Sequence, residues 1–165
     1  MTGERVVLVD SRGEEWAERY AMLRERIAVI LGDAQIEHIG STSVPEMPAK
    51  DVVDVLVGVP SADVTGATAL LEAAGFDVEG VRDGHAWLSI PHRDARTAVV
   101  HVVVHDDRQW QDRTDFRDLL RQSPAARDRY LAVKEQAAAS AVDWGDYTAS
   151  KADIVTTLLA EYRAQ

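Results

Sequence analysis

A Gly-Ser turn between two predicted strands constrains the fold of this chain more than any other feature of the sequence. The segment covers residues 37–59 and reads EHIGSTSVPEMPAKDVVDVLVGV. Residues 35–39 predict a first β-strand, the turn at Gly40 and Ser41 follows it, and residues 52–59 predict a second strand rich in valine. A strand this apolar is typical of one buried on both faces, in the interior of a sheet.

Helices and strands are both predicted in the rest of the first two thirds of the chain. Ser11 and Glu14 have the spacing of a capping box, and apolar residues at helical spacing then predict an amphipathic helix from Gly13 to Leu31. Gly75 is expected to end a second helix. That helix is predicted for residues 63–74. Strands are predicted for residues 6–9, 76–78, 86–90 and 97–104, and the last two of these are expected to form a hairpin.

After His105 the sequence predicts helices only, with breaks at Ser123-Pro124 and at residues 143–146. We therefore expect one α+β domain over residues 1–165, with a mixed β-sheet in the first two thirds. The helical C-terminal third is expected to pack on that sheet.

Composition and charge narrow the classes of function. The chain has 165 residues, no cysteine and a net charge of −10, and 46% of its residues are hydrophobic. Cysteine-based disulfides and metal sites are excluded, and a surface this acidic disfavours binding to DNA or RNA. No apolar run is long enough to span a membrane and the N-terminus lacks a signal-peptide pattern, so we expect a cytoplasmic protein that is a monomer or a homodimer.

The turn has the residue types of a phosphate-binding loop. Gly40 lets the backbone approach a ligand closely, and the small hydroxyl residues Ser41, Thr42 and Ser43 supply donors beside consecutive backbone amides. The alternative is an ordinary polar turn without a ligand, which four small residues alone do not exclude.

Asp54 is a lone acid within the valine-rich strand. Burying a carboxylate there is costly unless it is paired or binds a metal, so Asp54 is the candidate metal ligand and catalytic acid. Side chains alternate along a strand, so Leu56 shares its face, whereas Asp51 contributes only if it turns inward from the preceding loop. The alternative is a carboxylate that hydrogen-bonds to the backbone.

Other candidates depend on how the elements pack. His101 is a candidate metal ligand or proton-transfer group if its strand lies beside the strand of Asp54, and His38 is a second candidate of the same kind. For both, the alternative is a hydrogen-bonded core histidine. His85 and His92 are predicted to lie in loops. Candidate phosphate contacts, which can also be plain surface or packing residues, are Lys50, Arg93, Arg96, Tyr147 and Lys151.

The motifs EHIGSTSVP, Lys50 and Asp54 resemble the signature of the GrpB-like family of the nucleotidyltransferase-like superfamily. The resemblance continues through RTAVVHVVV, FRDLL and YTASK and through Tyr130 and Lys134, and so covers most of the chain. It implies a nucleotidyltransferase fold in which the Gly-Ser turn binds triphosphate and an Asp-x-Asp pair holds Mg²⁺ or Mn²⁺. Asp54 matches the first acid of that pair, and Leu56 stands in place of the second.

Three functions are compatible with these residues. The first is a nucleotidyltransferase that uses Mg²⁺ to move a nucleoside monophosphate from a nucleoside triphosphate to a small-molecule acceptor, with Asp51 or His101 replacing the missing acid. The second is a protein of the same fold that binds a nucleotide or phosphate without turnover, which Leu56 favours. The third is a metal-dependent hydrolase built on His38, Asp54 and His101.

Overall fold

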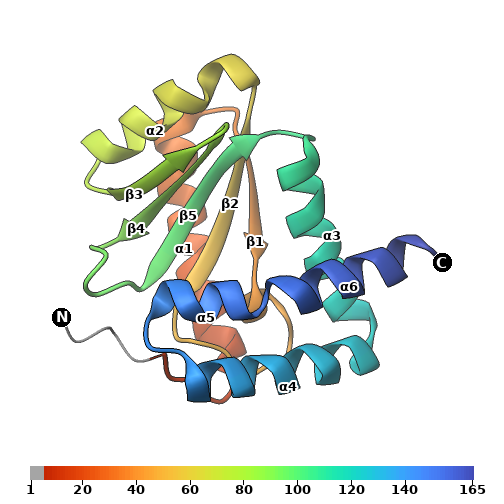
Figure 1. The fold of residues 1–165 in the computed structure, drawn as a ribbon. Coiled ribbons are helices and arrows are strands. Elements are labelled where there is room, and N and C mark those ends of the chain that lie inside the picture. The colour runs from red at the N-terminus through yellow and green to blue at the C-terminus, as the bar shows by residue number, and fades with distance from the viewer. Residues whose placement is uncertain (1–5) are drawn as a thin grey trace.

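The computed structural model describes residues 6–165, except for the side chain of Trp144, and is built around a mixed sheet of five strands (Figure 1). The order across the sheet is β1-β2-β5-β4-β3. The strands are β1 (Gln35–Ile39), β2 (Val53–Val59), β3 (Asp77–Arg82), β4 (His85–Ile90) and β5 (Ala98–Val104). β2 and β5 run parallel, and the other neighbours are antiparallel.

The register of β2 and β5 decides which side chains share a face. Val99 pairs with Asp54, and His101 pairs with Leu56. Because side chains alternate along each strand, Asp54, Leu56 and His101 all point to the same side of the sheet. The condition set for His101, that its strand lies beside the strand of Asp54, is therefore met.

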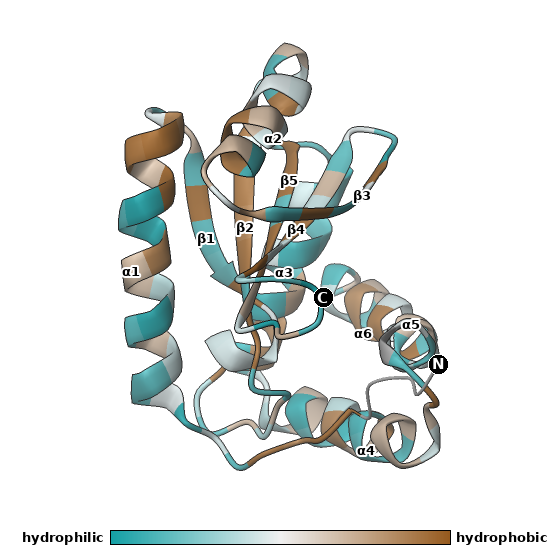
Figure 2. Ribbon diagram, turned by 90° about the vertical axis from the view of Figure 1, so that its left-hand side faces the viewer, coloured by the Kyte–Doolittle hydropathy of each residue, from teal (hydrophilic) through white to brown (hydrophobic). Residues whose placement is uncertain are grey.

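Helices α1 (Gly13–Leu31) and α2 (Val64–Ala73) cover the opposite face of the sheet (Figure 2). Trp16 and Ile27 of α1 are fully buried against Val55 and Val57 of β2. Burial of large apolar side chains is the main stabilising contribution to this half of the core.

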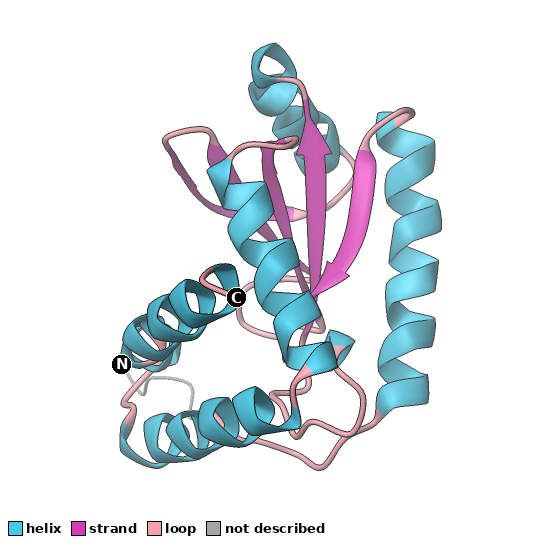
Figure 3. Cartoon of the chain, turned by 90° about the vertical axis from the view of Figure 1, so that its right-hand side faces the viewer, coloured by secondary structure: helices cyan, strands magenta, loops and turns pink. Residues whose placement is uncertain are grey.

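The face of the sheet that carries Asp54 is covered by α3 (Arg108–Gln122), and the C-terminal helices lie beyond it (Figure 3). Trp110 of α3 packs on Leu56, and both residues belong to a second apolar cluster. The remaining helices are α4 (Pro124–Ser140), α5 (Trp144–Ser150) and α6 (Ala152–Arg163). The side chains of Asp107, Ser123 and Asp143 cap the N-termini of α3, α4 and α5.

Several predicted elements differ from the structure. The capping box is wrong, because Arg12 is the N-cap of α1 and no side chain caps this end. The strand predicted for residues 6–9 is reduced to one bridge between Val9 and Ala49. The predicted break at residues 143–146 lies mostly within α5, since the Asp143 side chain starts a helical turn there.

The expected α+β fold is confirmed, with a mixed sheet followed by a helical C-terminal third. The helix predicted over Gly13 to Leu31 and the hairpin of β4 and β5 are also confirmed. Among the helices of residues 6–165, none combines the length and the apolar character that crossing a membrane requires.

Candidate functional site

The Gly-Ser turn and the carboxylate of Asp54 are in direct contact. Gly40 has φ 74° and ψ −177°, a conformation that favours glycine. A Cβ atom at this position would lie 2.6 Å from Oδ2 of Asp54, so no other residue fits here without displacing the acid. Ser41–Ser43 then form one short 3₁₀ turn, in which the Ser43 amide donates to the Gly40 carbonyl at 3.0 Å.

Asp54 is held in its ionised form by positive neighbours. Burial of the carboxyl group raises its pKa, but the hydrogen bond from His101 and the charges of His101, Lys50 and Lys151 outweigh burial and lower the pKa overall. His101 Nε2 lies 3.4 Å from Oδ1 of Asp54. Asp54 is therefore an anion whose charge is balanced by His101, Lys50 and Lys151.

All three lysines of the chain, Lys50, Lys134 and Lys151, converge on this site, whereas the other fifteen positive side chains are arginines. Lys50 Nζ lies 4.9 Å from the ring centroid of Tyr147, and Lys151 Nζ lies 4.3 Å from the same centroid. Lys134 is only 1% exposed and donates to the Pro48 carbonyl at 2.7 Å. We call these three residues the lysine cluster.

Burial and the charges of neighbouring lysines lower the pKa values of Lys50 and Lys134. Burial is the larger cause for Lys50, and Lys151 adds to it, so that the pKa falls to about 7. The pKa of Lys134 also falls to about 7, because of burial and the charges of Lys151 and Lys50. Such a cluster is stabilised by an anionic ligand, which would supply the missing negative charge.

Two connected hollows meet at Asp54. A small cavity of about 50 Å³ lies between the Gly40–Thr42 turn and the lysine cluster, and the buried ring of Tyr147 forms part of its wall. A larger cavity of about 790 Å³ opens on the other side. Lys50, Asp54 and Lys151 line both cavities, which together we call the cleft.

The larger cavity contains a chain of hydrogen-bonded side chains that starts at Asp54. His101 Nδ1 lies 3.0 Å from His85 Nε2, and the two rings are stacked with centroids 5.3 Å apart. Burial, followed by the charges of His101 and Arg113, lowers the pKa of His85 to about 3 and keeps this ring neutral. The prediction that His85 lies in a loop is wrong, since it begins β4 and faces the cleft.

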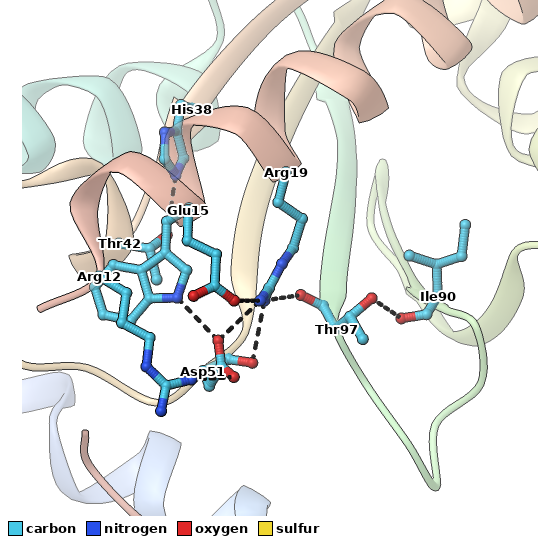
Figure 4. A network of polar contacts seen from close by, with 9 residues as sticks. Arg12, Glu15, Arg19, His38, Thr42, Asp51, Ile90 and Thr97 are labelled. Carbon is cyan, nitrogen blue, oxygen red and sulfur yellow. Dashed lines mark hydrogen bonds and ion pairs between the residues drawn. The ribbon is translucent and has the colours of Figure 1, made fainter. Parts of the chain in front are cut away.

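Asp51 is not brought together with Asp54. Its carboxylate accepts from Trp16 Nε1 at 2.9 Å and pairs with Arg12 and Arg19, each at 3.0 Å (Figure 4). These hydrogen bonds and ion pairs connect α1 and its N-cap to the loop before β2 and stabilise their packing. Asp51 lines neither cavity, so the structure does not bring the acid predicted to be catalytic to the cleft.

His38 lies beside the turn but outside the cleft. It stacks on Tyr20 with centroids 4.7 Å apart, and its Nε2 lies 2.9 Å from Thr42 Oγ1 (Figure 4). Burial lowers the pKa of His38 to about 4, so the ring is neutral, and its contact with Thr42 supports the turn.

The two arginines predicted to contact phosphate have partners of their own. Arg93 pairs with Asp77 at 2.8 Å, and Arg96 pairs with Glu79. Neither arginine lines the two cavities, although Glu79 does line the larger one. Lys50, Tyr147 and Lys151, by contrast, all line the small cavity.

The residues present do not fit a two-ion magnesium centre. Leu56 is fully buried on the face where a second acid would stand. Within residues 6–165 no three His, Asp or Glu side chains gather as metal ligands would, which also leaves the predicted centre of His38, Asp54 and His101 unformed. Asp54 faces ammonium groups in place of a second carboxylate.

Sequence reasoning gave no role to Lys134, His85, Trp87 or Arg113, which all line the cleft. A signal for Lys134 exists in the sequence, because lysine occurs only three times among eighteen Lys and Arg residues. His85, Trp87 and Arg113 reach the cleft only through strand pairing and the docking of α3, which no local pattern reveals.

The fold and the cleft together define a nucleotidyltransferase-fold protein. The Cid1 poly(U) polymerase, in a crystal structure with Mg 3′-dATP bound, is similar with a TM-score of 0.54 at 17% identity. The similarity covers 80% of this chain and 43% of that one. At this identity the likeness shows the fold alone.

The chain belongs to the GrpB family, because the model described as GrpB protein matches residues 5–161. A UPF0157 protein of Deinococcus radiodurans is 45% identical over 156 residues, which are 94% of this chain and 82% of the relative. The crystal structure of the conserved protein GrpB from Enterococcus faecalis is similar with a TM-score of 0.78 at 28% identity, covering 94% of this chain and 99% of that one. The predicted family and fold are confirmed, while the names of these relatives state no activity.

Proposed function

We propose that this protein binds the phosphate groups of a nucleotide in the cleft, between the Gly-Ser turn and the lysine cluster. The observation that carries the proposal is the convergence of all three lysines of an acidic chain on one turn. Lys50 and Lys134 have pKa values of about 7, and an anionic ligand favours their protonated form, in which three ammonium groups facing one carboxylate leave an excess of positive charge at this place. A ligand with several negative charges restores the balance, and polyphosphates have that charge.

The polar atoms of the small cavity support the same ligand. The Tyr147 hydroxyl is buried and has no hydrogen-bond partner within the described part of the chain. An orphaned buried donor costs free energy unless a ligand or water accepts from it. The Ser41 hydroxyl and the amides of the turn supply donors on one side of the small cavity, and the lysine cluster lies on the other side.

The larger cavity accommodates the rest of the ligand. Its volume of about 790 Å³ lies within the range of small-molecule sites. Trp87 and His85 offer ring faces there, and Arg113 offers a cation. A nucleoside and a small acceptor both fit such a space, whereas the net charge of −10 disfavours RNA as the acceptor.

Nucleotidyl transfer is the second candidate, and the chain from Asp54 through His101 to His85 favours it. An acceptor hydroxyl or amine would attack the α-phosphorus, the bond to the β-phosphate would break, and pyrophosphate would leave. The proton of the acceptor would pass by way of neutral His101 to the solvent, since the low pKa of His85 keeps that ring from holding it. The magnesium or manganese ion expected from the family resemblance is not part of this proposal, because the residues of the cleft do not fit a two-ion centre.

Titration calorimetry with ATP, GTP, CTP and UTP, once in EDTA and once in Mg²⁺, tests the proposal. We expect binding of at least one nucleotide, and a loss of about tenfold or more in affinity for Lys50→Met, since a hydrogen bond to a charged group contributes about 1.5–3 kcal/mol. The matched control is Arg108→Met, which removes one positive charge from a side chain that is 90% exposed and outside the cleft. Absence of binding, or equal affinity for both variants, contradicts the proposal.

Pyrophosphate release separates the two candidates. Release that depends on an added hydroxyl or amine acceptor, and that falls in His101→Ala, supports transfer. Nucleotide binding without release over a broad panel of acceptors supports binding alone. An RNA oligonucleotide included in the panel shows whether the acceptor class is wrong.

A further inference from the structure

We propose that the cleft binds its phosphate ligand without a divalent cation, with the lysine cluster supplying the positive charge that a metal ion supplies in a two-metal site. This inference rests on the proposed function and concerns how the same site holds the ligand. It follows from the surroundings of Asp54 and from the composition of the cleft.

Both carboxylate oxygens of Asp54 already have close neighbours. Oδ1 is 3.4 Å from His101 Nε2, and a Cβ atom at Gly40 would lie only 2.6 Å from Oδ2, so the turn leaves little room on that side of the carboxylate. Mg²⁺ requires near-ideal octahedral coordination at about 2.0–2.1 Å and is usually held through one or two carboxylates. The carboxylate is thus committed to His101 and packed on the turn, and Leu56 supplies no second ligand.

The lysine cluster lines the cavities in which the ligand phosphates would lie. Lys50 and Lys151 line both cavities, and Lys134 closes the small one. Lysines in their protonated form repel a metal ion and attract a phosphate, so the lysine cluster favours the phosphate. The charge of the cluster therefore selects the bare polyphosphate over its magnesium complex.

Asp54 then has a different role from that of a metal ligand. In the free protein it is the anion that offsets part of the charge of the lysine cluster, and in the complex its negative charge faces the phosphate. Without a metal between them, the carboxylate and the phosphate repel each other. Removing the charge of Asp54 should therefore strengthen binding, whereas a metal-dependent site would lose its anchor.

The experiment compares the affinity of ATP in EDTA and in Mg²⁺ for wild type and Asp54→Asn. Asparagine keeps the shape of the side chain and an oxygen that still accepts from His101. We expect wild type to bind in EDTA at least as tightly as in Mg²⁺, and Asp54→Asn to bind about threefold or more tightly than wild type in EDTA. Binding that needs Mg²⁺ and disappears in Asp54→Asn overturns the inference but leaves the proposed function standing.

A second variant and a metal probe guard against failure of Asp54→Asn to fold. Lys50→Met should weaken binding in EDTA about tenfold or more, while Arg108→Met should not. Electron paramagnetic resonance of Mn²⁺ with the nucleotide-free protein should show the ion free in solution, and bound Mn²⁺ overturns the inference. If ATP binds in neither EDTA nor Mg²⁺, the proposed function fails, and the inference fails with it.

Discussion

Replacing Lys134 by methionine should change how the stability of this protein depends on pH. The side chain is 1% exposed, and burial together with Lys151 and Lys50 lowers its pKa from 10.5 to about 7. The unfolded chain keeps the ordinary value, so between pH 7 and pH 10.5 the unfolded state holds more protons than the folded state. The free energy of unfolding of wild type therefore rises with pH across this window.

The shift sets the size of the effect. With pKa values of 10.5 and about 7, the Lys134 contribution to the free energy of unfolding improves by about 2 kcal/mol between pH 7 and pH 9. Methionine lacks the titrating group. From pH 7 to pH 9 the free energy of unfolding of wild type should therefore rise by about 2 kcal/mol more than that of Lys134→Met. The Pro48 carbonyl loses its donor in the variant at a cost of about 1–3 kcal/mol, but this cost is the same at both pH values.

Urea unfolding at pH 7, 8 and 9, followed by tryptophan fluorescence, measures the difference. Arg108→Met is the control, because a guanidinium group does not titrate in this range and its difference from wild type should stay constant. Equal pH dependence for wild type and Lys134→Met would refute the reasoning, since Lys134 would then have an ordinary pKa. The same variant should bind ATP more weakly, so that stability at pH 7 and binding respond to one ammonium group.

Two further variants separate the turn from the structural contacts around it. Gly40→Ala should lower the melting temperature and weaken nucleotide binding, because its positive φ costs about 1–2 kcal/mol and its Cβ displaces Asp54; binding equal to wild type in a calorimetric titration would contradict this. Asp51→Asn should lower the free energy of unfolding by about 1 kcal/mol through the weakened bonds to Trp16 and Arg19, with nucleotide affinity unchanged. A tenfold weaker affinity in Asp51→Asn would place this acid in the site after all.

The sequence predicted much of the fold because its local signals agree with its packing. The amphipathic helix α1, the valine-rich β2 and the hairpin of β4 and β5 each follow from apolar periodicity and turn residues. That His101 shares the face of Asp54 follows from the register of β2 and β5, which periodicity along one strand does not give. The capping box failed because the chain enters α1 one residue later than the motif implies.

The site was harder to predict because partners far apart in the sequence decide it. Asp51 has the residue type of a metal ligand, but Trp16 and Arg19 from α1 turn it away from the cleft. Arg96 has the residue type of a phosphate contact, but Glu79 of β3 pairs with it. Local composition shows which residues can do chemistry, and only the packed helices and strands decide which of them meet.

Ligand protection of the three lysines tests the central claim most directly. The chain contains no other lysine. The rate at which an amine-acetylating reagent modifies lysine side chains, followed by peptide mass spectrometry, therefore reports on the cleft residues Lys50, Lys134 and Lys151 alone. We predict that ATP in EDTA slows acetylation of Lys50 and Lys151 severalfold relative to a lysine peptide added as reference, and that adenosine does not. Labelling rates that ATP leaves unchanged would contradict the account, because the phosphates would then not lie among the lysines.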